Sequence, residues 1–170
     1  MRNIIVIFLS VLILCSAVVT SACDSSGPEI PEIEIEADSI TVGFEDHSTI
    51  QLTKGSPEFK EINDEAIRIC QNICDTMECV LGPENVEEMK YDNKFVEIGF
   101  IEPVSVTTYT DEGDVYKILD SPSVIFVFTG EYAGFVLCAP TPPTDWPEWA
   151  VLGSRRSLGN LETMVDALHT

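Results

Sequence analysis

The chain has 170 residues and carries 9 basic against 29 acidic side chains, which gives a formal net charge of −20. This length suits one domain with its own core, and a hydrophobic content of 45% is ordinary for a folded protein. Because phosphate groups are held mainly by Lys and Arg, the charge excludes nucleic-acid binding through a basic surface and favours a cationic or neutral partner.

A secretory signal peptide is predicted over residues 1–22. Arg2 precedes an apolar run from Ile4 to Val19, and small residues follow the run. The run is about 16 residues long, whereas a helix that spans a bilayer needs roughly 20. We therefore expect the segment to be cleaved rather than kept as an anchor.

Cys23 directly follows the small residues Ser21 and Ala22, as a cleavage site requires. The segment Val19–Cys23 resembles the lipobox of bacterial lipoproteins, although Thr20 stands where that family prefers leucine. The resemblance implies that Cys23 becomes the first residue, carries lipid and holds the protein at the extracytoplasmic face of the cell membrane. Ordinary cleavage after Ala22, which leaves Cys23 as an unmodified thiol, is the alternative.

Residues 23–38 are predicted to form an acidic tether, and residues 39–170 a single domain. Acidic and apolar residues alternate after Pro31, which is the period-two pattern of a strand. This stretch is expected either to stay extended without a fixed partner or to dock on the domain as an edge strand. The domain itself is expected to open with a hairpin of residues 39–44 and 48–53.

A long amphipathic helix is predicted after the hairpin. Ser56 provides an N-cap and Pro57 suits the first helical position. Apolar side chains from Phe59 to Met77 fall on one face at 100° per residue. We expect the helix to end before Pro83, because proline removes a backbone donor and constrains the residue ahead of it.

The second half of the domain is predicted to be an antiparallel meander. Short turns separate its five strands, which cover residues 94–102, 104–110, 115–119, 124–128 and 135–139. The strand 124–128 is apolar on both faces, so it is expected to be central and covered on both sides. The long helix covers one side, and a short C-terminal helix capped by Asn160 is expected on the other, through Leu161, Met164, Val165 and Leu168.

The predicted fold class is therefore α+β, with a meander sheet, one long amphipathic helix packed on it and a short C-terminal helix. The meander contains the hairpin Thr129-Gly130-Glu131-Tyr132. It resembles a hairpin of small lipoproteins common in bacterial envelopes, in which a strand and a helix precede the meander. One long helix on such a sheet is also similar to cystatin-like folds. These folds host many unrelated functions, so the resemblance implies a fold and no activity.

Four cysteines besides Cys23 remain after the signal peptide: Cys70, Cys74, Cys79 and Cys138. Outside the cytoplasm they can form disulfides, and four thiols allow three pairings. Cys70 and Cys74 would lie one turn apart on the predicted helix with parallel side chains, which is poor geometry for a bond. We favour Cys70 with Cys138 and Cys74 with Cys79; free buried thiols and a four-cysteine metal site are the alternatives.

Catalytic residues are not evident in the sequence. Its two histidines are His47, in a predicted turn, and His169, beside the C-terminus. Motifs for serine nucleophiles, zinc hydrolysis and phosphate binding are absent, and neither a metal nor a cofactor is predicted. Acidic residues such as Glu97, Glu102 and Glu131 could serve glycoside hydrolysis, although pairs of this kind arise by chance among 29 acids.

Two features are candidates for partner binding. Trp146 and Trp149 occupy a stiff, proline-rich loop, where the rings could stack on a sugar or form a protein hot spot, or could instead plug a sheet edge. Arg155 and Arg156 are the only adjacent basic pair and could form a polar rim, unless they pair with the protein's own acids. We therefore predict a non-catalytic binding or regulatory module of the cell envelope, whose partner is an envelope protein or a glycan. A wall-glycan hydrolase is the alternative.

Overall fold

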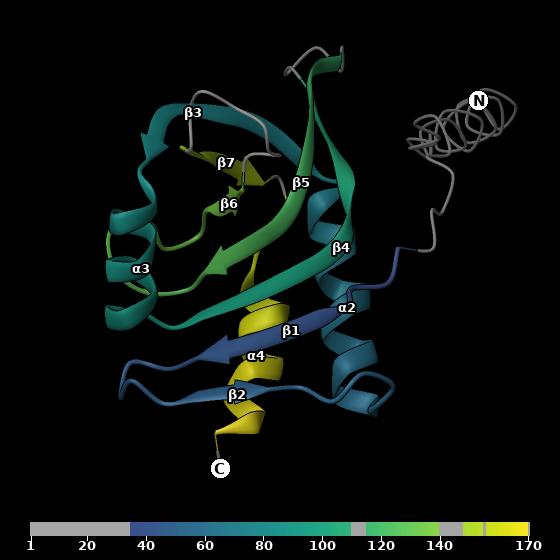
Figure 1. Cartoon of the computed structure of the whole chain (residues 1–170), viewed down its shortest axis with the longest axis vertical. Helices are drawn as coiled ribbons and strands as arrows, with labels where there is room; N and C mark the ends of the chain where they lie inside the picture. Colours follow the sequence, from purple (N-terminus) through teal and green to yellow (C-terminus); the bar gives the residue numbers. More distant parts are fainter. Residues whose placement is uncertain (1–34, 110–114, 140–147, 155, 170) are drawn as a thin grey trace, which may run out of the picture. The chain divides into compact units, whose positions relative to one another are not determined.

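Seven strands among the described residues form one antiparallel sheet in the order β2-β1-β4-β5-β6-β7-β3 (Figure 1). The computed structural model describes residues 35–109, 115–139, 148–154 and 156–169, without the side chains at 74–79, 106–109 and 115–119. Three helices in these ranges accompany the sheet: α2 (Pro57–Cys70), α3 (Pro83–Asp92) and α4 (Gly159–Leu168). This arrangement confirms the α+β class and the antiparallel sheet. None of these helices is long and apolar enough to cross a membrane.

The predicted opening hairpin is present as β1 (Ser39–Gly43) and β2 (Thr49–Gln51). Ahead of it, Ile35–Asp38 already lie against the core, and Ala37 is fully buried. Asn63 of α2 holds this segment: its Oδ1 accepts from the Ala37 amide at 2.9 Å and its Nδ2 donates to the Ile35 carbonyl at 3.1 Å. The compact unit therefore begins at Ile35.

Helix α2 begins where it was predicted and ends earlier. The Ser56 hydroxyl accepts from the Phe59 amide at 3.1 Å, and a proline occupies the first turn. The last turn closes on Asn72, whose side-chain Nδ2 donates to the Arg68 carbonyl at 2.7 Å. The prediction of one long helix is therefore wrong for the residues after Cys70, where α2 ends.

Residues 73–81 form a strand, β3 (Ile73–Leu81), instead of the end of a helix. Their apolar residues fit a helical period and a strand period about equally, so periodicity does not decide between the two. Pairing with β7 (Trp149–Ser154), a strand that was not predicted, supplies the hydrogen bonds that decide it. Cys70 and Cys74 consequently lie in different elements rather than on one helix.

Helix α3 was missed, because Gly82 and Pro83 were interpreted as the end of a helix. Pro83 stands in the first turn of α3, where its missing N–H costs no hydrogen bond. Glu84 in the first turn and Lys90 in the last turn complement the helix dipole. Pro83 therefore marks the start of a helix.

The meander consists of β4 (Phe95–Tyr109), β5 (Val115–Val127) and β6 (Val136–Cys138). Strands β4 and β5 each join two of the predicted strands into one, and their pairing shifts register between Gly99 and Val104. Pro103 lies in this interval, and a proline cannot donate to the ladder. As predicted, β5 lies between two strands and its apolar run is buried on both faces.

Two clusters of buried side chains cover the two faces of β5. The larger cluster joins Phe126 to residues of α2 and α4. The smaller cluster joins Ile125 to Val86 and Met89 of α3. The expectation that the C-terminal helix covers the second face is therefore wrong: α4 packs on the same face as α2, and α3 takes the other (Figure 1).

Helix α4 presents the face that was predicted. Leu161 and Val165 are buried in the larger cluster, and Met164 and Leu168 pack against it. The predicted cap is wrong: Asn160 lies inside the helix, and the N-cap position is Leu158, whose side chain makes no cap hydrogen bond. The Ser157 hydroxyl accepts from the Gly159 amide at 3.1 Å instead. Packing of the apolar face therefore holds α4 in place without a cap from Asn160.

Candidate functional site

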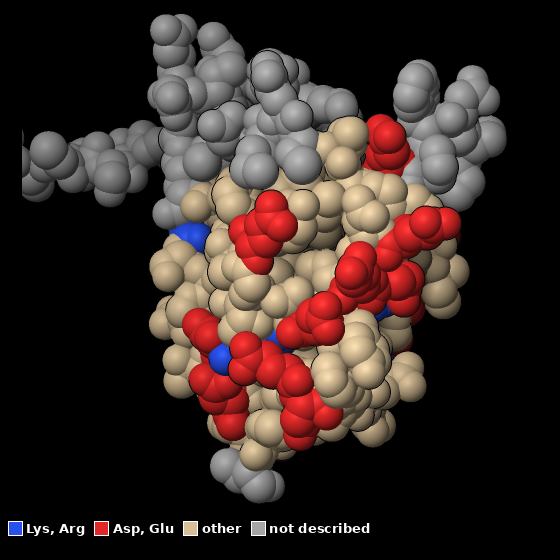
Figure 2. Space-filling model, turned by 90° about the vertical axis from the view of Figure 1, so that its left-hand side faces the viewer, with Lys and Arg blue, Asp and Glu red and all other residues tan. Residues whose placement is uncertain are grey.

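The exposed side of α3 is strongly acidic. Figure 2 views the molecule from this side and shows Asp and Glu side chains spread across it, with few basic atoms between them. The ten-residue helix contributes four exposed acids, namely Glu84, Glu87, Glu88 and Asp92. A cation that approaches this side meets an attractive field, whereas an anion is repelled.

The single lysine of α3 is occupied by the protein's own carboxylates. Lys90 Nζ lies 2.9 Å from Glu97 Oε2 in β4 and 3.2 Å from Glu87 Oε1. Burial opposes the charge of Lys90, but its hydrogen bonds with Glu97 and Glu87 outweigh burial and raise the lysine pKa. Lys90 therefore stays protonated and fastens α3 to the sheet.

A pocket of about 340 Å³ opens between α3 and the loop that joins β5 to β6. Its lining, which defines the α3 pocket, consists of Asn85, Glu88, Met89, Asp92, Asn93, Glu131 and Tyr132. Three of these residues are carboxylates at exposed positions, whereas Met89 is buried and Tyr132 half-buried. The α3 pocket thus combines negative charge with apolar surface.

Contacts between the two walls fix the shape of the α3 pocket. The Lys94 amide donates to the Thr129 hydroxyl at 2.9 Å, and the Phe128 amide donates to the Lys94 carbonyl at 2.9 Å. Gly130 has a φ of 79° and lies so close to the Asn93 side chain that a Cβ would collide with it. Glycine is therefore required at this point of the loop.

The carboxylates of the α3 pocket have no basic partner within the described part of the chain. No lysine or arginine described there forms an ion pair with Glu88, Asp92 or Glu131. In the same ranges, no three His, Cys, Asp or Glu side chains converge as metal ligands would. The three carboxylates therefore offer negative charge and hydrogen-bond acceptors to a group that enters the pocket.

Both histidines lie at the β1–β2 turn. His47, whose φ is 66°, stacks on Tyr91 of α3 at 4.2 Å between ring centroids, and its Nδ1 is 2.8 Å from the Tyr91 carbonyl. His169 stacks on Phe44 at 4.1 Å and places Nε2 3.2 Å from Asp46 Oδ2. The two rings thus connect the turn to the C-terminal ends of α3 and α4.

Asp46 gives a test of this turn at low pH. Hydrogen bonds from the Ser48 hydroxyl and amide, with a smaller contribution from His169, lower the pKa of Asp46 to about 2 from 3.8. Because the folded value is the lower one, ionised Asp46 stabilises the fold above the unfolded pKa, and this contribution is lost as pH falls from 3.8 towards about 2. Carboxyl NMR should give a midpoint near 2, and Ser48→Ala should raise it. A titration midpoint of Asp46 near 3.8 in the folded chain would contradict its hydrogen bonds with Ser48.

Arg156, a predicted rim residue, is engaged inside the protein. Its Nε and Nη2 each donate to a different oxygen of Glu65 in α2 at 3.0 Å, and Glu65 is only 2% exposed. Arg68 adds a longer contact of 3.4 Å to the same carboxylate. Arg155 lies outside the described residues. The guanidinium of Arg156 thus joins α2 to the segment before α4. For Arg156, this is the alternative in which the basic pair binds the protein's own acids instead of a partner.

Of the two candidate tryptophans, Trp149 lies in the described part of the chain. Trp149 begins β7, is half-buried and pairs in register with Leu81 of β3. It packs against the smaller core cluster, so it belongs to the sheet rather than to a loop. Trp146 lies outside the described residues, as does Cys23.

The structure places two of the four candidate cysteines in one core. Cys70 and Cys138 are free thiols, Cys138 is buried in the larger cluster, and Cys70 packs against that cluster. Cys74 and Cys79 lie five residues apart along β3. The ladder with β7 is irregular between Thr76 and Val80, and β7 advances only three residues, from Gly153 to Ala150, while β3 runs from Asp75 to Val80. Three extended residues still cover about 10 Å, whereas a disulfide needs a Cα separation of less than about 7 Å. Strand geometry therefore opposes a bond between them.

The carboxylates considered for hydrolysis do not form one group. Glu97 has both oxygens engaged, with Lys90 and with the Ser123 hydroxyl at 2.9 Å each. Glu102 is exposed beside Pro103 in β4, and Glu131 lines the α3 pocket. Of the three, Glu131 alone belongs to the pocket.

Sequence reasoning did not find the α3 pocket, although a signal was present. Pro83 and Glu84 suit a helix start, and Val86 and Met89 have helical spacing before Lys90. No protein-family model, no curated protein and no solved structure matches the chain. The chemistry of the α3 pocket is consequently the guide to function.

Proposed function

We propose that the chain is a non-catalytic binding module, tethered by lipid at the extracytoplasmic face of the cell membrane, that takes a cationic side chain of an envelope protein into the α3 pocket. The observation that carries this proposal is the presence of Glu88, Asp92 and Glu131 in one pocket, without a basic partner among the described residues. A binding module needs a shaped and charged surface of this kind and no catalytic group.

The lining of the α3 pocket matches the two parts of a lysine or arginine side chain. The apolar stem of such a side chain packs on surfaces like those of Met89 and Tyr132, while its charged head remains near carboxylates. Hydrogen bonds between a cation and a carboxylate are stronger than those between neutral groups. This pairing explains why a cationic side chain is preferred over an apolar one.

The charge of the whole chain supports the same partner class. A net charge of −20 attracts a basic protein over several ångströms and repels acidic ones. Exposed charges are screened within about 8 Å at physiological salt. Binding is therefore expected to weaken as salt rises.

A charge-matched comparison tests the pocket. A tetralysine peptide is titrated into the chain, and the amide signals of Met89 and Tyr132 are followed by NMR. The triple variant Glu88→Gln, Asp92→Asn, Glu131→Gln should lose at least about tenfold in affinity, or roughly 1.4 kcal/mol. The control variant Glu58→Gln, Glu61→Gln, Glu102→Gln changes the net charge equally at exposed sites elsewhere and should stay within about twofold of wild type.

Three outcomes would contradict the proposal. Equal losses in both triple variants would mean that the overall field, not the α3 pocket, attracts the peptide. Absence of shifts at Met89 and Tyr132 in wild type would mean that the pocket takes no cationic side chain. Release of sugars from wall glycan by the purified chain would favour the hydrolase instead.

The tether has its own test at Cys23. Replacing Cys23 with Ser removes the only thiol that the lipobox-like segment offers for acylation, so we expect the variant to lose all label from a metabolically supplied fatty acid. The variant should also leave the membrane fraction. Equal labelling of wild type and variant, or labelling of neither, would contradict the lipid anchor without bearing on the α3 pocket.

A further inference from the structure

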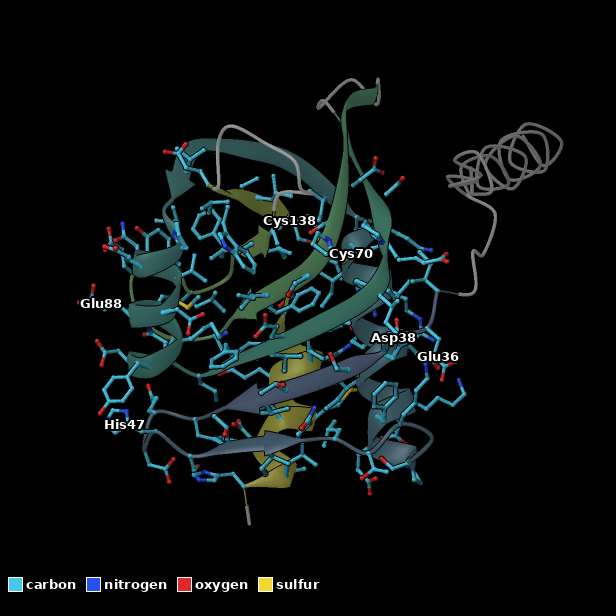
Figure 3. The ribbon with its side chains drawn as sticks, in the orientation of Figure 1. Glu36, Asp38, His47, Cys70, Glu88 and Cys138 are labelled. Atoms are coloured by element: carbon cyan, nitrogen blue, oxygen red, sulfur yellow. The ribbon has the colours of Figure 1, made fainter. Side chains whose placement is uncertain are left out.

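We propose that Cys70 and Cys138 form a disulfide that ties the C-terminal end of α2 to the centre of the sheet. Cys70 is the last residue of α2, and Cys138 is the last residue of β6. Figure 3 shows the two labelled side chains where the end of α2 meets the middle strands. Sequence reasoning favoured this pair among several, and the fold supplies the reason to choose it.

The surroundings of the two residues place them in one packed region. Cys138 is 2% exposed and lies in register between Val124 of β5 and Ala150 of β7. Cys70 follows the fully buried Ile69 and packs against the same cluster of side chains as Cys138. Both thiols are free in the structure, and a bond at this point would join two elements that pack into the same core cluster.

The other two cysteines do not compete from the same place. Cys74 and Cys79 belong to β3, which forms one edge of the sheet and pairs with β7. Strand β7 separates β3 from β6, so the backbone of β3 lies two strands away from Cys138 in the sheet order. Adjacent strands are about 4.8 Å apart. Two strand spacings exceed the Cα separation of about 7 Å that a disulfide tolerates.

The chemistry of the two thiols indicates a structural bond rather than a catalytic pair. Burial raises the pKa of the Cys70 thiol to about 12, and burial together with the nearby Cys70 raises the pKa of the Cys138 thiol. A thiol that stays protonated is a poor nucleophile. The bond is therefore expected to form while the chain folds, before the thiols are buried, and to resist reductants afterwards.

The bond forms by two exchange steps with a disulfide-bearing oxidant. The thiolate of one cysteine attacks the oxidant, which releases one thiol and leaves a mixed disulfide. The second cysteine, as thiolate, attacks the sulfur of the first, and the oxidant leaves as its second thiol. The protein loses two protons and two electrons in total, and the oxidant takes them up as it is reduced to its two-thiol form.

Refolding of full-length variants tests the pairing independently of where the protein resides. Both variants carry Cys15→Ser and Cys23→Ser, so that only the cysteines under test remain. The test variant adds Cys74→Ser, Cys79→Ser and keeps Cys70 and Cys138, and the control adds Cys70→Ser, Cys79→Ser and keeps Cys74 and Cys138. Each is reduced, unfolded, refolded in a glutathione redox buffer, quenched with acid and alkylated in denaturant, because the folded thiols would not react. Non-reducing peptide mapping should find the Cys70–Cys138 peptide in the first variant and no linked pair in the control.

The same mapping of wild-type chain shows whether Cys70–Cys138 is preferred when all cysteines compete. Recovery of Cys70 and Cys138 as separately alkylated peptides after refolding would overturn the proposal. Equal linkage of Cys74 with Cys138 in the control would overturn it as well. Neither result affects the α3 pocket, whose test uses peptide affinity.

Discussion

Replacing Arg156 with alanine is expected to lower the free energy of unfolding by about 2–3 kcal/mol. The substitution leaves the carboxylate of Glu65 buried, with only the longer contact to Arg68 at 3.4 Å. Loss of one partner of a fully buried pair costs about 3–5 kcal/mol. The Arg156 side chain is 36% exposed, so water screens its attraction to Glu65. The expected loss in the free energy of unfolding is therefore smaller than for a fully buried pair.

Two further variants separate the ion pair from general damage. Arg68→Ala should cost less than about 1 kcal/mol, because the Arg68 side chain is 58% exposed. The double variant Glu65→Leu, Arg156→Leu should be more stable than Arg156→Ala, because no charge is left buried without its partner. Urea denaturation measures all three. Equal stability of Arg156→Ala and wild type would show that the pair contributes nothing.

Replacing Phe126 with alanine is expected to cost about 3–5 kcal/mol, which is a large part of the 5–15 kcal/mol that holds a typical domain folded. Phe126 is fully buried in β5, in the cluster that α2 and α4 share. Its removal deletes apolar contacts and leaves a cavity that the surrounding strands can fill only in part. Thermal unfolding by circular dichroism should show a markedly lower midpoint.

Ile101 provides the matched control for Phe126. It is an apolar residue of β4 with 82% of its surface exposed. Ile101→Ala should change stability by no more than about 0.5 kcal/mol. If both alanine variants behaved alike, Phe126 could not lie in the core as described.

The parts of the fold that were predicted correctly are those that local chemistry decides. Ser56 and Pro57 mark the start of α2 because capping and proline geometry act over one turn. The apolar run in β5 indicates a strand buried on both faces, since no half-exposed strand would carry it. Neither conclusion needs information from a distant part of the chain.

The parts that were predicted wrongly depend on distant partners. Residues 73–81 become a strand because β7 pairs with them, and β7 lies more than 60 residues further along the chain. The covering of the sheet by α3 instead of α4 also depends on tertiary packing. The spacing of apolar residues along one segment cannot reveal which distant strand or helix will pack against it.

The candidate site was predicted less well than the fold. Overall acidity predicts which partners the surface repels, but charge summed over a sequence has no position. The α3 pocket arises because Gly130 lets the β5–β6 loop approach Asn93, which brings Glu131 near Glu88 and Asp92. Glu131 lies more than 35 residues after Glu88 and Asp92 in the chain, and only folding brings it to them.

Photocrosslinking in living cells tests the proposed function most directly. A photoreactive residue replaces Asn85, on the rim of the α3 pocket, and in a second strain it replaces Glu61, an exposed residue of α2. We predict one protein adduct at position 85 that carries basic residues at the crosslinked segment, is absent at position 61 and disappears when Glu88, Asp92 and Glu131 are neutralised. An adduct at position 85 that persists in the neutralised variant, or the same adduct at both positions, would contradict a binding module that works through the α3 pocket.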